Sequence, residues 1–401
     1  MRILIISSYL PYPLFSGGHV RLYNLLKHLS TRHQIVFVCE KRDHQTEKDI
    51  LEVKKFCEEI ITVDRKKQWS LNNILKTAFS LYPFLLIGHT NSEMRKKIEN
   101  LFIKEKFDLI HVETFYVMQN LPKTNLPIVL TEHNIEYLVY KRYANNAAIF
   151  LRPFLFLDVL KMKYWEKYFW KNATKVIAVS DEERKIMGKK DVAIVQNGVD
   201  KEAFKINSAG WKTKFKETKK ILFIGDFKWI QNRTSVEWIL KKIWPIISSK
   251  FKSEGSISDI KLWIVGRNIP DDIKKLTDDN DVIFDENAPK ETSEIFKQAD
   301  LLLAPIKVGG GTSFKILEAM ASGIPVVTTS LGIEGIEAKI GKDVLVSDLE
   351  EEMADLVVSV ISDEKIYEKI SQNARKLIEE KYDWAPIVQK LEGVYKSVLK
   401  I

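Results

Sequence analysis

The chain is poor in cysteine. Its 401 residues include only Cys39 and Cys57, which form no Cys-x-x-Cys pair and no cluster with histidine. This spacing argues against a structural metal site and against a disulfide framework. We expect both to be small core residues of a protein in the reducing cytoplasm.

Long hydrophobic runs are also missing. The most apolar stretch, residues 147–160, is interrupted by Arg152, Pro153 and Asp158. A helix that spans a bilayer needs about 20 apolar residues, so the sequence predicts no membrane-spanning helix. The N-terminal run MRILIISSYL is too short for the apolar core of a signal peptide and suits a first β-strand.

No strong excess of charge of one sign is present. The chain has 62 basic and 54 acidic residues, a net charge of +8 that is spread along its length. This bias suits an anionic small molecule or an anionic membrane surface as well as it suits nucleic acid. Because no block interleaves basic with aromatic residues, as a nucleic-acid groove requires, we predict no nucleic-acid partner.

What the chain does have is a regular alternation of short apolar strands and helical patterns. This alternation favours parallel sheets with helices on both faces. A polar stretch without a period, residues 201–219, fits a linker between two α/β domains that face a cleft. In open sheets, ligands bind beyond the carboxyl ends of the strands. The expected strands are residues 2–7, 34–40, 59–63, 108–113, 127–132, 175–180 and 192–200, then 221–226, 261–266, 281–284, 299–305, 325–329 and 343–347.

The stretch VGGGTSFKILEAMASGIPVVTT, residues 308–329, carries the clearest chemistry. Its glycines allow the backbone to approach a ligand closely, and they directly precede a helix whose free N–H groups attract anions. Lys315 adds positive charge one turn into this helix. Glu318 lies one turn further on the same side and can accept hydrogen bonds from a sugar diol. Phosphate at the helix start and a diol beside it match a nucleoside diphosphate.

This stretch resembles the donor-site signature of the retaining glycosyltransferases of the GT-B fold, family 4. Members carry Glu, seven residues and a second Glu, then Ala-Met-Ala, a glycine and Pro-Val-Val. Glu318 matches the second glutamate, which holds the ribose hydroxyls in the family. The first glutamate falls at Gly310, where this chain has the Gly-Gly-Gly-Thr-x-x-Lys form of a subgroup. The resemblance implies that a nucleotide-sugar contacts Gly310, Gly311, Thr312, Ser313, Phe314, Lys315 and Glu318.

Two stretches of the first half support the resemblance. Residues 7–26 resemble the family's first loop and helix, in which Gly17 and Gly18 would lie against the phosphate of the donor and against the acceptor. Residues 130–137, LTEHNIEY, resemble the family's histidine motif, so His133 would face the transferred sugar at the carboxyl end of a strand. Glu132 and Glu136 fit a solvated or helix-capping position instead.

Residues 221–240 resemble the first strand and loop of the family's second domain. Many members place an arginine directly after the glycine and a lysine five residues later, both on the diphosphate. Asp226 and Gln231 occupy these places here. Lys228 and Arg233 lie close in sequence and could supply the missing positive charge, although surface loop charges are an equal alternative.

In the family, the last helix returns to the first domain. The implied domains are therefore residues 1–200 with the helix 384–401, and residues 201–383. Residues 138–172 are rich in aromatic and basic side chains. This composition fits a helix packed on its own domain, with a peripheral contact on the inner face of the cytoplasmic membrane as the alternative. Family members act on saccharide or lipid-linked acceptors.

The sequence therefore predicts a retaining glycosyltransferase in which His133 and Glu318 act on the donor. The expected partners are a nucleotide-sugar and a saccharide or lipid-linked acceptor in polysaccharide or glycolipid synthesis. No protein nucleophile is evident. No Asp-x-Asp pair follows a suitable strand, and the run Asp278, Asp279 and Asp281 resembles a solvated loop, so we predict neither a metal nor another cofactor. Two alternatives remain open: an epimerase-like enzyme that acts on nucleotide-sugars, and a binding protein without catalytic activity.

Overall fold

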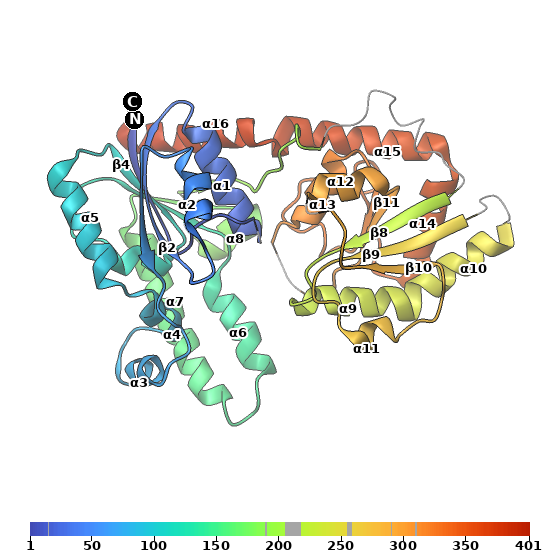
Figure 1. Cartoon of the computed structure of the whole chain (residues 1–401), viewed down its shortest axis with the longest axis horizontal. Coiled ribbons are helices and arrows are strands. Elements are labelled where there is room, and N and C mark those ends of the chain that lie inside the picture. The colour runs from blue at the N-terminus through green and yellow to red at the C-terminus, as the bar shows by residue number, and fades with distance from the viewer. Residues whose placement is uncertain (15, 189–190, 205–217, 255–258, 290, 309–310) are drawn as a thin grey trace. The chain divides into compact units, whose positions relative to one another are not determined.

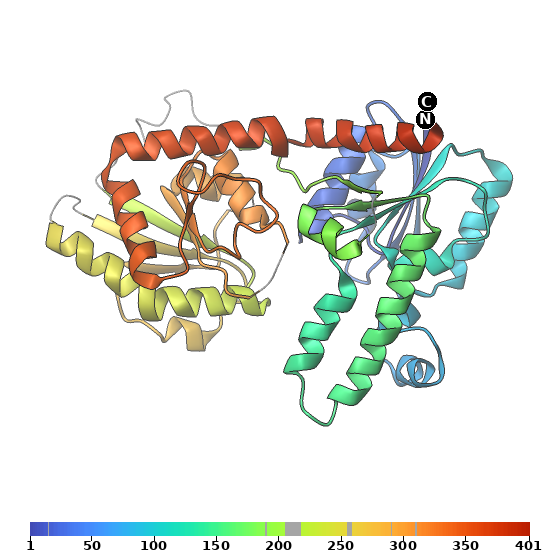
Figure 2. The same ribbon diagram turned by 180° about the vertical axis from the view of Figure 1, so that it is seen from behind.

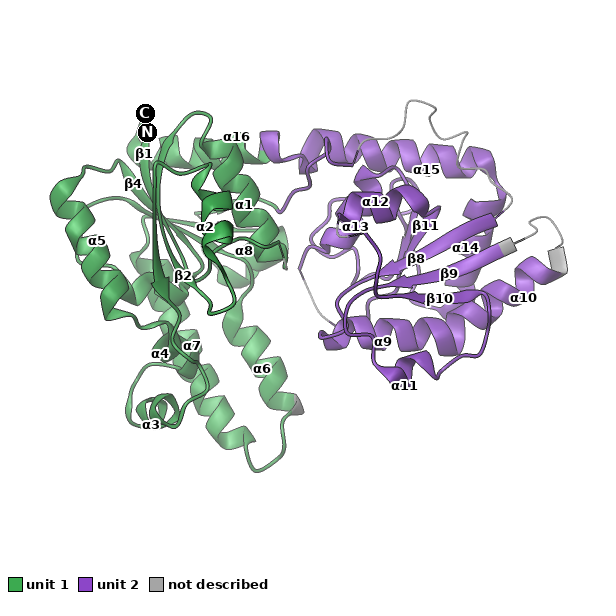
Figure 3. Ribbon diagram, in the orientation of Figure 1, with its two compact units in different colours: residues 1–196, 387–401 green, residues 197–386 purple. Residues whose placement is uncertain are grey.

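The computed structural model describes residues 1–14, 16–188, 191–204, 218–254, 259–289, 291–308 and 311–401. Figures 1 and 2 show the chain from opposite sides. It forms two compact units, residues Met1–Gln196 together with Ile387–Ile401, and residues Asn197–Pro386 (Figure 3).

The first unit is built on a seven-stranded parallel sheet with the strand order β3-β2-β1-β4-β5-β6-β7. Near-continuous apolar strands of this kind are buried on both faces, and residues Ile3–Ile6 of the first strand are at most 1% exposed. The strands are β1 (Arg2–Ser7), β2 (Gln34–Lys41), β3 (Glu59–Asp64), β4 (Leu109–Glu113), β5 (Ile128–Glu132), β6 (Lys175–Ala178) and β7 (Val192–Ile194).

Helices connect these parallel strands, as crossover connections require. Helix α1 begins behind Ser16, whose hydroxyl accepts a hydrogen bond from the backbone N–H of His19 at 3.4 Å. Helices α6 and α7 form a hairpin that extends away from the sheet (Figures 1 and 2). The helices are α1 (Gly17–Leu29), α2 (Glu47–Lys54), α3 (Leu71–Phe79), α4 (Phe84–His89), α5 (Ser92–Lys104), the 3₁₀ helix η1 (Phe115–Asn120), α6 (Glu136–Asn146), α7 (Arg152–Asn172) and α8 (Asp181–Met187).

The second unit repeats the architecture with a six-stranded sheet in the order β10-β9-β8-β11-β12-β13. Its strands are β8 (Thr218–Ile224), β9 (Asp259–Val265), β10 (Val282–Asp285), β11 (Leu301–Ala304), β12 (Val326–Thr328) and β13 (Leu345–Val346). Its helices are α9 (Ile230–Trp238), the π-helical turn η3 (Ile239–Ile243), α10 (Trp244–Glu254), α11 (Asp271–Lys274), α12 (Thr292–Gln298), α13 (Phe314–Ala321), α14 (Glu350–Ser362), α15 (Glu364–Leu377) and the π-helical turn η4 (Ile378–Tyr382).

The last helix, α16 (Trp384–Leu399), packs its later turns on the first unit. Ile387, Leu391 and Tyr395, which have helical spacing, are fully buried. Glu392 accepts hydrogen bonds from Arg32 at 2.7 Å and pairs with His33 at 3.0 Å. This helix therefore completes the core of the first unit.

The α/β prediction is confirmed, since each expected strand is present in one of two parallel sheets. Two details differ. The strand expected over 192–200 ends at Ile194, because the carbonyl groups of Val195 and Gln196 accept hydrogen bonds from Arg21 instead of a neighbouring strand. Residues 218 and 219, expected in a linker, begin β8, and most of that linker lies outside the described residues.

Candidate functional site

In the first unit, three neighbouring strands end at one point of the sheet. Ser7 of β1 pairs with Glu113 of β4, and Glu113 pairs with Thr131 of β5. The sheet order reverses at β1, which has β2 on one side and β4 on the other. Ligands of open α/β sheets bind at such a reversal, beyond the carboxyl ends of the strands.

The structure brings Gly18 and His133 together at this edge. A Cβ atom on Gly18 would lie 3.3 Å from Nδ1 of His133 and 3.1 Å from the hydroxyl oxygen of Tyr9. The hydroxyl of Tyr9 donates a hydrogen bond to the carbonyl of Gly18 at 3.2 Å. Glycine at position 18 therefore allows helix α1 to pack closely on the histidine. Gly17 is the first residue of the same helix.

His133 is held by a buried carboxylate that the sequence analysis missed. Its Nε2 lies 2.7 Å from Oε1 of Glu113, and the same oxygen accepts a hydrogen bond from Nε of Arg21 at 3.1 Å. The side chains of Arg21 and Glu113 are fully buried. Nε2 of His111 lies 2.9 Å from the other carboxylate oxygen of Glu113.

The surroundings of Glu113 keep it ionised. Burial by itself would raise the pKa of this carboxyl, but hydrogen bonds from His111 and His133 and the charges of His133 and Arg21 hold it well below its ordinary value. An ionised carboxylate can only accept hydrogen bonds, so the Nε2 of His133 must carry the proton that they share. The opposite ring nitrogen, Nδ1, is thereby turned to the side of Gly18.

Helix α16 contacts this cluster through Tyr395. The hydroxyl of Tyr395 lies 2.6 Å from Nδ1 of His111, and Oγ1 of Thr131 lies 2.8 Å from Nε2 of the same ring. Nη1 of Arg21 donates to the carbonyl groups of Val195 and Gln196 at 3.1 and 2.9 Å. Elements from both ends of the chain therefore fix the orientation of His133.

Glutamates of β5, α6 and α7 form a second cluster in the first unit. The carboxylate of Glu166 accepts hydrogen bonds from the backbone N–H groups of Glu136 and Tyr137 at 2.8 and 3.0 Å, so it caps helix α6 from helix α7. The prediction that Glu132 is solvated or capping is wrong, because its side chain is buried and accepts a hydrogen bond from the indole of Trp170 at 2.9 Å. Burial and the charge of Glu166 raise the pKa of Glu132 well above its ordinary value.

In the second unit, the sheet order reverses between β8 and β11. The glycine loop and helix α13 follow β11, and helix α9 follows β8. Gly309 and Gly310 lie outside the described residues. Gly311 has φ of 81°, a left-handed conformation that favours glycine, and Oγ1 of Thr312 donates to the carbonyl of Gly335 at 3.4 Å.

Among the described residues, the start of helix α13 has no side-chain cap. Ser313 occupies the capping position, but its side chain accepts no hydrogen bond from the first turn. The helix begins at Phe314, which is half-buried. Uncapped N–H groups at a helix start form a ready site for an anion.

Lys315 and Glu318 face this region from the same helix. Nζ of Lys315 donates to Oδ1 of Asn232 at 2.8 Å and lies 4.4 Å from the ring centre of Phe223. Oε1 of Glu318 accepts one long hydrogen bond, from Oγ1 of Thr292 at 3.4 Å. Neither contact is a direct ion pair.

Both side chains have strongly shifted pKa values. Burial lowers the pKa of Lys315 to about 7, against the opposing effect of Glu318. Burial also raises the pKa of Glu318 to about 7, although the hydrogen bond from Thr292 and the charge of Lys315 oppose this. Both groups therefore change protonation state near neutral pH, which is typical of a site prepared for a charged ligand.

The loop after β8 approaches Lys315 through Asn232. A Cβ atom on Gly225 would lie 2.6 Å from Cγ of Asn232, so the loop requires glycine there, and Nδ2 of Asn232 donates to the carbonyl of Asp226 at 2.7 Å. Arg233 uses its Nε to bind the carbonyl of Phe227. The side chain of Lys228 is exposed.

Among the residues of these clusters that were not found from the sequence are Arg21, Glu113, Asn232 and Thr292. Glu113 gave a usable signal, since it is an acidic residue at the carboxyl end of a fully buried strand. The others lie on helices, where polar side chains are common.

The described residues contain no group of three or more histidine, cysteine or acidic side chains that could hold a metal ion. Asp279 is not simply solvated, because it accepts hydrogen bonds from the indole of Trp244 at 2.9 Å and from the N–H of Asp281 at 2.9 Å. Within the same described ranges, no helix has the length and apolar character needed to cross a membrane.

Comparison with known families finds a match in each unit. Residues 15–203 match the model of Glycosyltransferase Family 4. Residues 218–363 match the model of Glycosyl transferases group 1.

Two curated proteins are similar along most of the chain. An uncharacterized 44.6 kDa protein in the cps region of Klebsiella pneumoniae is 24% identical over 403 residues, which cover 95% of this chain and 96% of that protein. An uncharacterized glycosyltransferase of Methanocaldococcus jannaschii is 26% identical over 340 residues, which cover 77% of this chain and 80% of that protein.

Solved structures share the fold at low identity. Sucrose-phosphate synthase from Thermosynechococcus elongatus matches with a TM-score of 0.71 at 14% identity, over 100% of both chains. HepE from Anabaena, solved in complex with UDP and glucose, has a TM-score of 0.64 at 14% identity, over 99% of this chain and 100% of that chain. WaaG, described as a glycosyltransferase involved in lipopolysaccharide biosynthesis, has a TM-score of 0.61 at 15% identity, over 99% of both chains.

Proposed function

We propose that this chain, which has the GT-B fold, is a glycosyltransferase that moves a sugar from a nucleotide-diphosphate-sugar to an acceptor hydroxyl with retention of configuration. The observation that carries the proposal is the uncapped start of helix α13 with Lys315 and Glu318 beside it. The N–H groups and Lys315 suit a diphosphate, and Glu318 suits the hydroxyls of its ribose.

The loose bonding of Glu318 supports this role. Its one side-chain partner among the described residues, Thr292, is 3.4 Å away, so most of the capacity of the carboxylate to accept hydrogen bonds is left for a ligand. A ribose diol would satisfy it and favour its ionised form, thereby lowering its raised pKa.

Further positive charge is available close to Lys315. The side chain of Lys228 is exposed on the loop that follows β8. Asn232 connects this loop to Lys315, because it donates a hydrogen bond to the carbonyl of Asp226 and accepts one from Lys315. We assign Lys228 an auxiliary role towards the diphosphate. Arg233 is assigned mainly to loop structure, since its Nε binds a backbone carbonyl.

In the first unit, His133 is assigned to orient the transferred sugar. Glu113 fixes its Nε2, and the ring is 16% exposed, so Nδ1 can form a hydrogen bond with a sugar hydroxyl. Gly17 and Gly18 are assigned to the close approach of the donor and acceptor at the start of helix α1. Glu113 itself is unsuited to act as a nucleophile, because it is buried and bonded to Arg21 and His133.

We therefore favour transfer on one face of the sugar. The bond from the anomeric carbon to the phosphate oxygen breaks, and the bond to the acceptor oxygen forms on the same face. The acceptor proton passes to the departing phosphate oxygen. Lys315 and the start of helix α13 stabilise the negative charge of the nucleoside diphosphate as it leaves.

The biological setting is proposed from the relatives. One of them is named for a cps region and another for lipopolysaccharide biosynthesis, which favours synthesis of cell-surface polysaccharide or glycolipid. The acceptor would be a saccharide or a lipid-linked saccharide. Both cysteines are free and buried, which fits the reducing cytoplasm.

A thermal-shift screen against a panel of nucleotide-sugars tests the assignment, because a bound donor raises the unfolding temperature. We expect one nucleotide class to stabilise the protein and Glu318→Gln to reduce that shift strongly. The matched control is Glu334→Gln, which changes an exposed carboxylate of the same unit. If no nucleotide-sugar stabilises the wild type, the proposal is wrong.

Turnover assays separate the alternatives. Consumption of the donor that requires an acceptor, with the anomeric configuration kept in the product, supports the proposal. Conversion of the donor without an acceptor would indicate an epimerase-like enzyme, and binding without any turnover would indicate a silent binding protein. We expect EDTA to leave the rate unchanged; loss of activity would contradict the metal-free assignment.

A further inference from the structure

A wide apolar surface is left open on the first unit. We call it the basic apolar face; it consists of helix α3 with its flanking residues and the outer side and tip of the α6–α7 hairpin. None of the residues of helix α3 is buried, and Phe79 at its end is 89% exposed. Its exposed apolar and aromatic residues are Trp69, Leu71, Ile74, Leu75, Phe79, Leu81, Tyr143, Ile149, Phe150, Leu151, Phe154, Leu157, Leu160, Tyr164 and Tyr168.

Contacts join the two parts into one surface. Nζ of Lys161 donates to the carbonyl of Thr77 at 2.6 Å, and the indole of Trp165 donates to the carbonyl of Leu81 at 2.9 Å. Tyr82 stacks on Trp165 with ring centres 4.4 Å apart. Helix α3 is therefore docked on helix α7, and both views of the chain show the two helices side by side (Figures 1 and 2).

The charge of this surface has one sign. Between residues 66 and 81, and again between 139 and 171, the only acidic residues are Asp158 and Glu166, and both are buried. Asp158 accepts a hydrogen bond from the backbone N–H of Phe84, and Glu166 caps helix α6. The basic residues of these two stretches, all exposed or half-buried, are Lys66, Lys67, Lys76, Lys141, Arg142, Arg152, Lys161, Lys163, Lys167 and Lys171.

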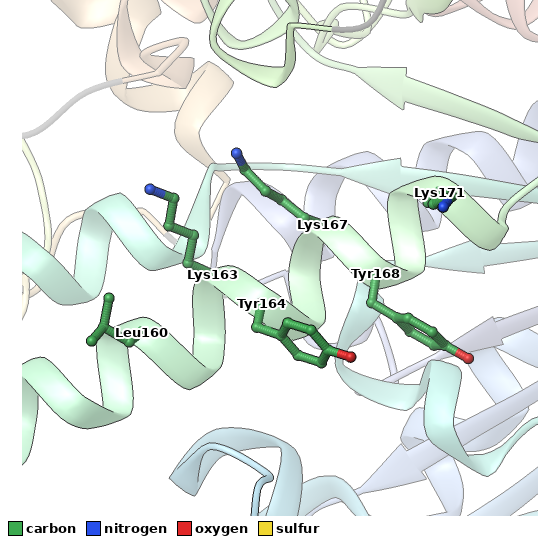
Figure 4. A pocket seen from close by; sticks show the side chains of 6 residues that line it. All are labelled: Leu160, Lys163, Tyr164, Lys167, Tyr168 and Lys171. Atoms are coloured by element: carbon green, nitrogen blue, oxygen red, sulfur yellow. The ribbon is translucent and has the colours of Figure 1, made fainter.

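A groove of about 500 Å³ runs along helix α7 in this face (Figure 4). Two rows with a spacing of four residues line it, one of Leu160, Tyr164 and Tyr168, the other of Lys163, Lys167 and Lys171. The lysine side chains Lys163 and Lys167 extend to one side of the helix and the two tyrosine rings to the other (Figure 4). An amphipathic row of aromatic rings beside a row of ammonium groups suits the boundary between lipid headgroups and acyl chains.

We propose that the basic apolar face docks on an anionic lipid bilayer, with the apolar side chains of helix α3 and of the hairpin tip in the outer acyl region and the lysines of helix α7 on the headgroup phosphates. A second copy of the chain fits less well, because a symmetric interface would place this basic surface against itself. This docking goes beyond the proposed transfer reaction, since it requires neither donor nor acceptor.

Co-sedimentation with vesicles tests the proposal. We expect the full chain to bind vesicles of phosphatidylcholine and phosphatidylglycerol at low salt, to bind pure phosphatidylcholine much less, and to dissociate as salt rises. The double variant Phe79→Ser/Phe150→Ser should weaken binding by about tenfold or more, since it removes two apolar anchors. Lys163→Glu/Lys167→Glu should weaken it by at least a similar factor.

The matched control is Ile103→Ser/Lys104→Glu, which removes an equally exposed apolar side chain and a lysine from helix α5 of the same unit. It should bind like the wild type, and all variants should keep the wild-type unfolding temperature. Absence of binding to anionic vesicles at low salt overturns the proposal, as does equal loss in the control. A wild-type dimer that Phe79→Ser/Phe150→Ser converts to a monomer would instead identify this face as a protein interface.

Discussion

The two candidate clusters of this protein are built in opposite ways. Around His133, the carboxylate of Glu113 is bonded to Arg21 and to two histidines and stays ionised. Around helix α13, Lys315 contacts the neutral side chains of Asn232 and Phe223, Glu318 accepts one long hydrogen bond from Thr292, and both groups have a pKa of about 7. In the first cluster the carboxylate is held by charged protein partners, whereas Glu318 in the second has unused hydrogen-bonding capacity.

This difference separates two tasks. A group that orients a substrate must itself be fixed, and charge pairing in a buried site supplies that rigidity. A group that binds a charged ligand gains most when the ligand supplies its missing partner. We therefore expect variants of the first cluster to lose stability and variants of the second to lose binding.

The largest expected effect is on the stability of the first unit. Glu113→Gln leaves the buried guanidinium of Arg21 without its counter-charge, and breaking a buried pair in this way costs about 3–5 kcal/mol. Denaturant unfolding measures the change. The control Glu58→Gln breaks a partly exposed pair with Arg2 and should cost no more than about 1 kcal/mol. Similar losses in both variants would show that the cluster is not specially stabilising.

The next effect is on nucleotide binding by the second unit. Lys315→Met should weaken binding of the nucleotide-sugar by about 10- to 100-fold, since it removes a hydrogen bond to a charged phosphate. Its free energy of unfolding should stay within about 1 kcal/mol of the wild type, because the lysine is already disfavoured by burial. Calorimetric titration and denaturant unfolding measure the two quantities. Lys297→Met, which changes an exposed side chain of helix α12, should change neither quantity. A destabilised Lys315→Met variant would contradict the comparison.

The pH dependence of binding should be bell-shaped. Glu318 must be ionised to accept hydrogen bonds from a diol, so binding should weaken below about pH 6. Lys315 must be protonated to bind the negatively charged diphosphate, so binding should weaken above about pH 8. A nucleotide-sugar is the suitable ligand, because its diphosphate does not titrate in this range. Lys315→Met should remove the alkaline decline and Glu318→Gln the acidic one. Unchanged profiles in both variants would show that other groups titrate.

The same two pKa shifts make the free energy of unfolding depend on pH in the opposite way to ligand binding. The pKa of Glu318 is raised in the folded state, so its contribution to the free energy of unfolding falls as pH rises from 4.5 to about 7. The pKa of Lys315 is lowered, so its contribution rises from about pH 7 to 10.5. The two contributions together are smallest near pH 7, where binding should be strongest.

The smallest expected effect is on the geometry of His133. Gly18→Ala places a methyl group 3.3 Å from its Nδ1, which should shift the ring slightly and lower kcat by about three- to tenfold. Stability should change by no more than about 1 kcal/mol, because alanine favours the helix. Gly393→Ala on helix α16 meets no atom within 4 Å and should leave kcat unchanged. A Gly18→Ala enzyme with wild-type kcat would argue against a catalytic position for His133.

The sequence by itself determined the two parallel sheets and the start of helix α13. Apolar runs such as Ile3–Ile6 and the glycines before Phe314 are local signals, because strand burial and backbone freedom depend on neighbours in the chain. It also placed Lys315 and Glu318 on one side of a helix, since helical spacing alone decides this.

Only the tertiary structure decided which side chains meet. Glu113 contacts Arg21 and His133 because β4 lies between β1 and β5, an order that no local pattern encodes. The pKa values of Lys315 and Glu318 follow from burial against other elements, as does the joining of helix α3 to helix α7. Contacts between distant parts of the chain depend on strand order and on packing, whereas the elements themselves depend mainly on local sequence.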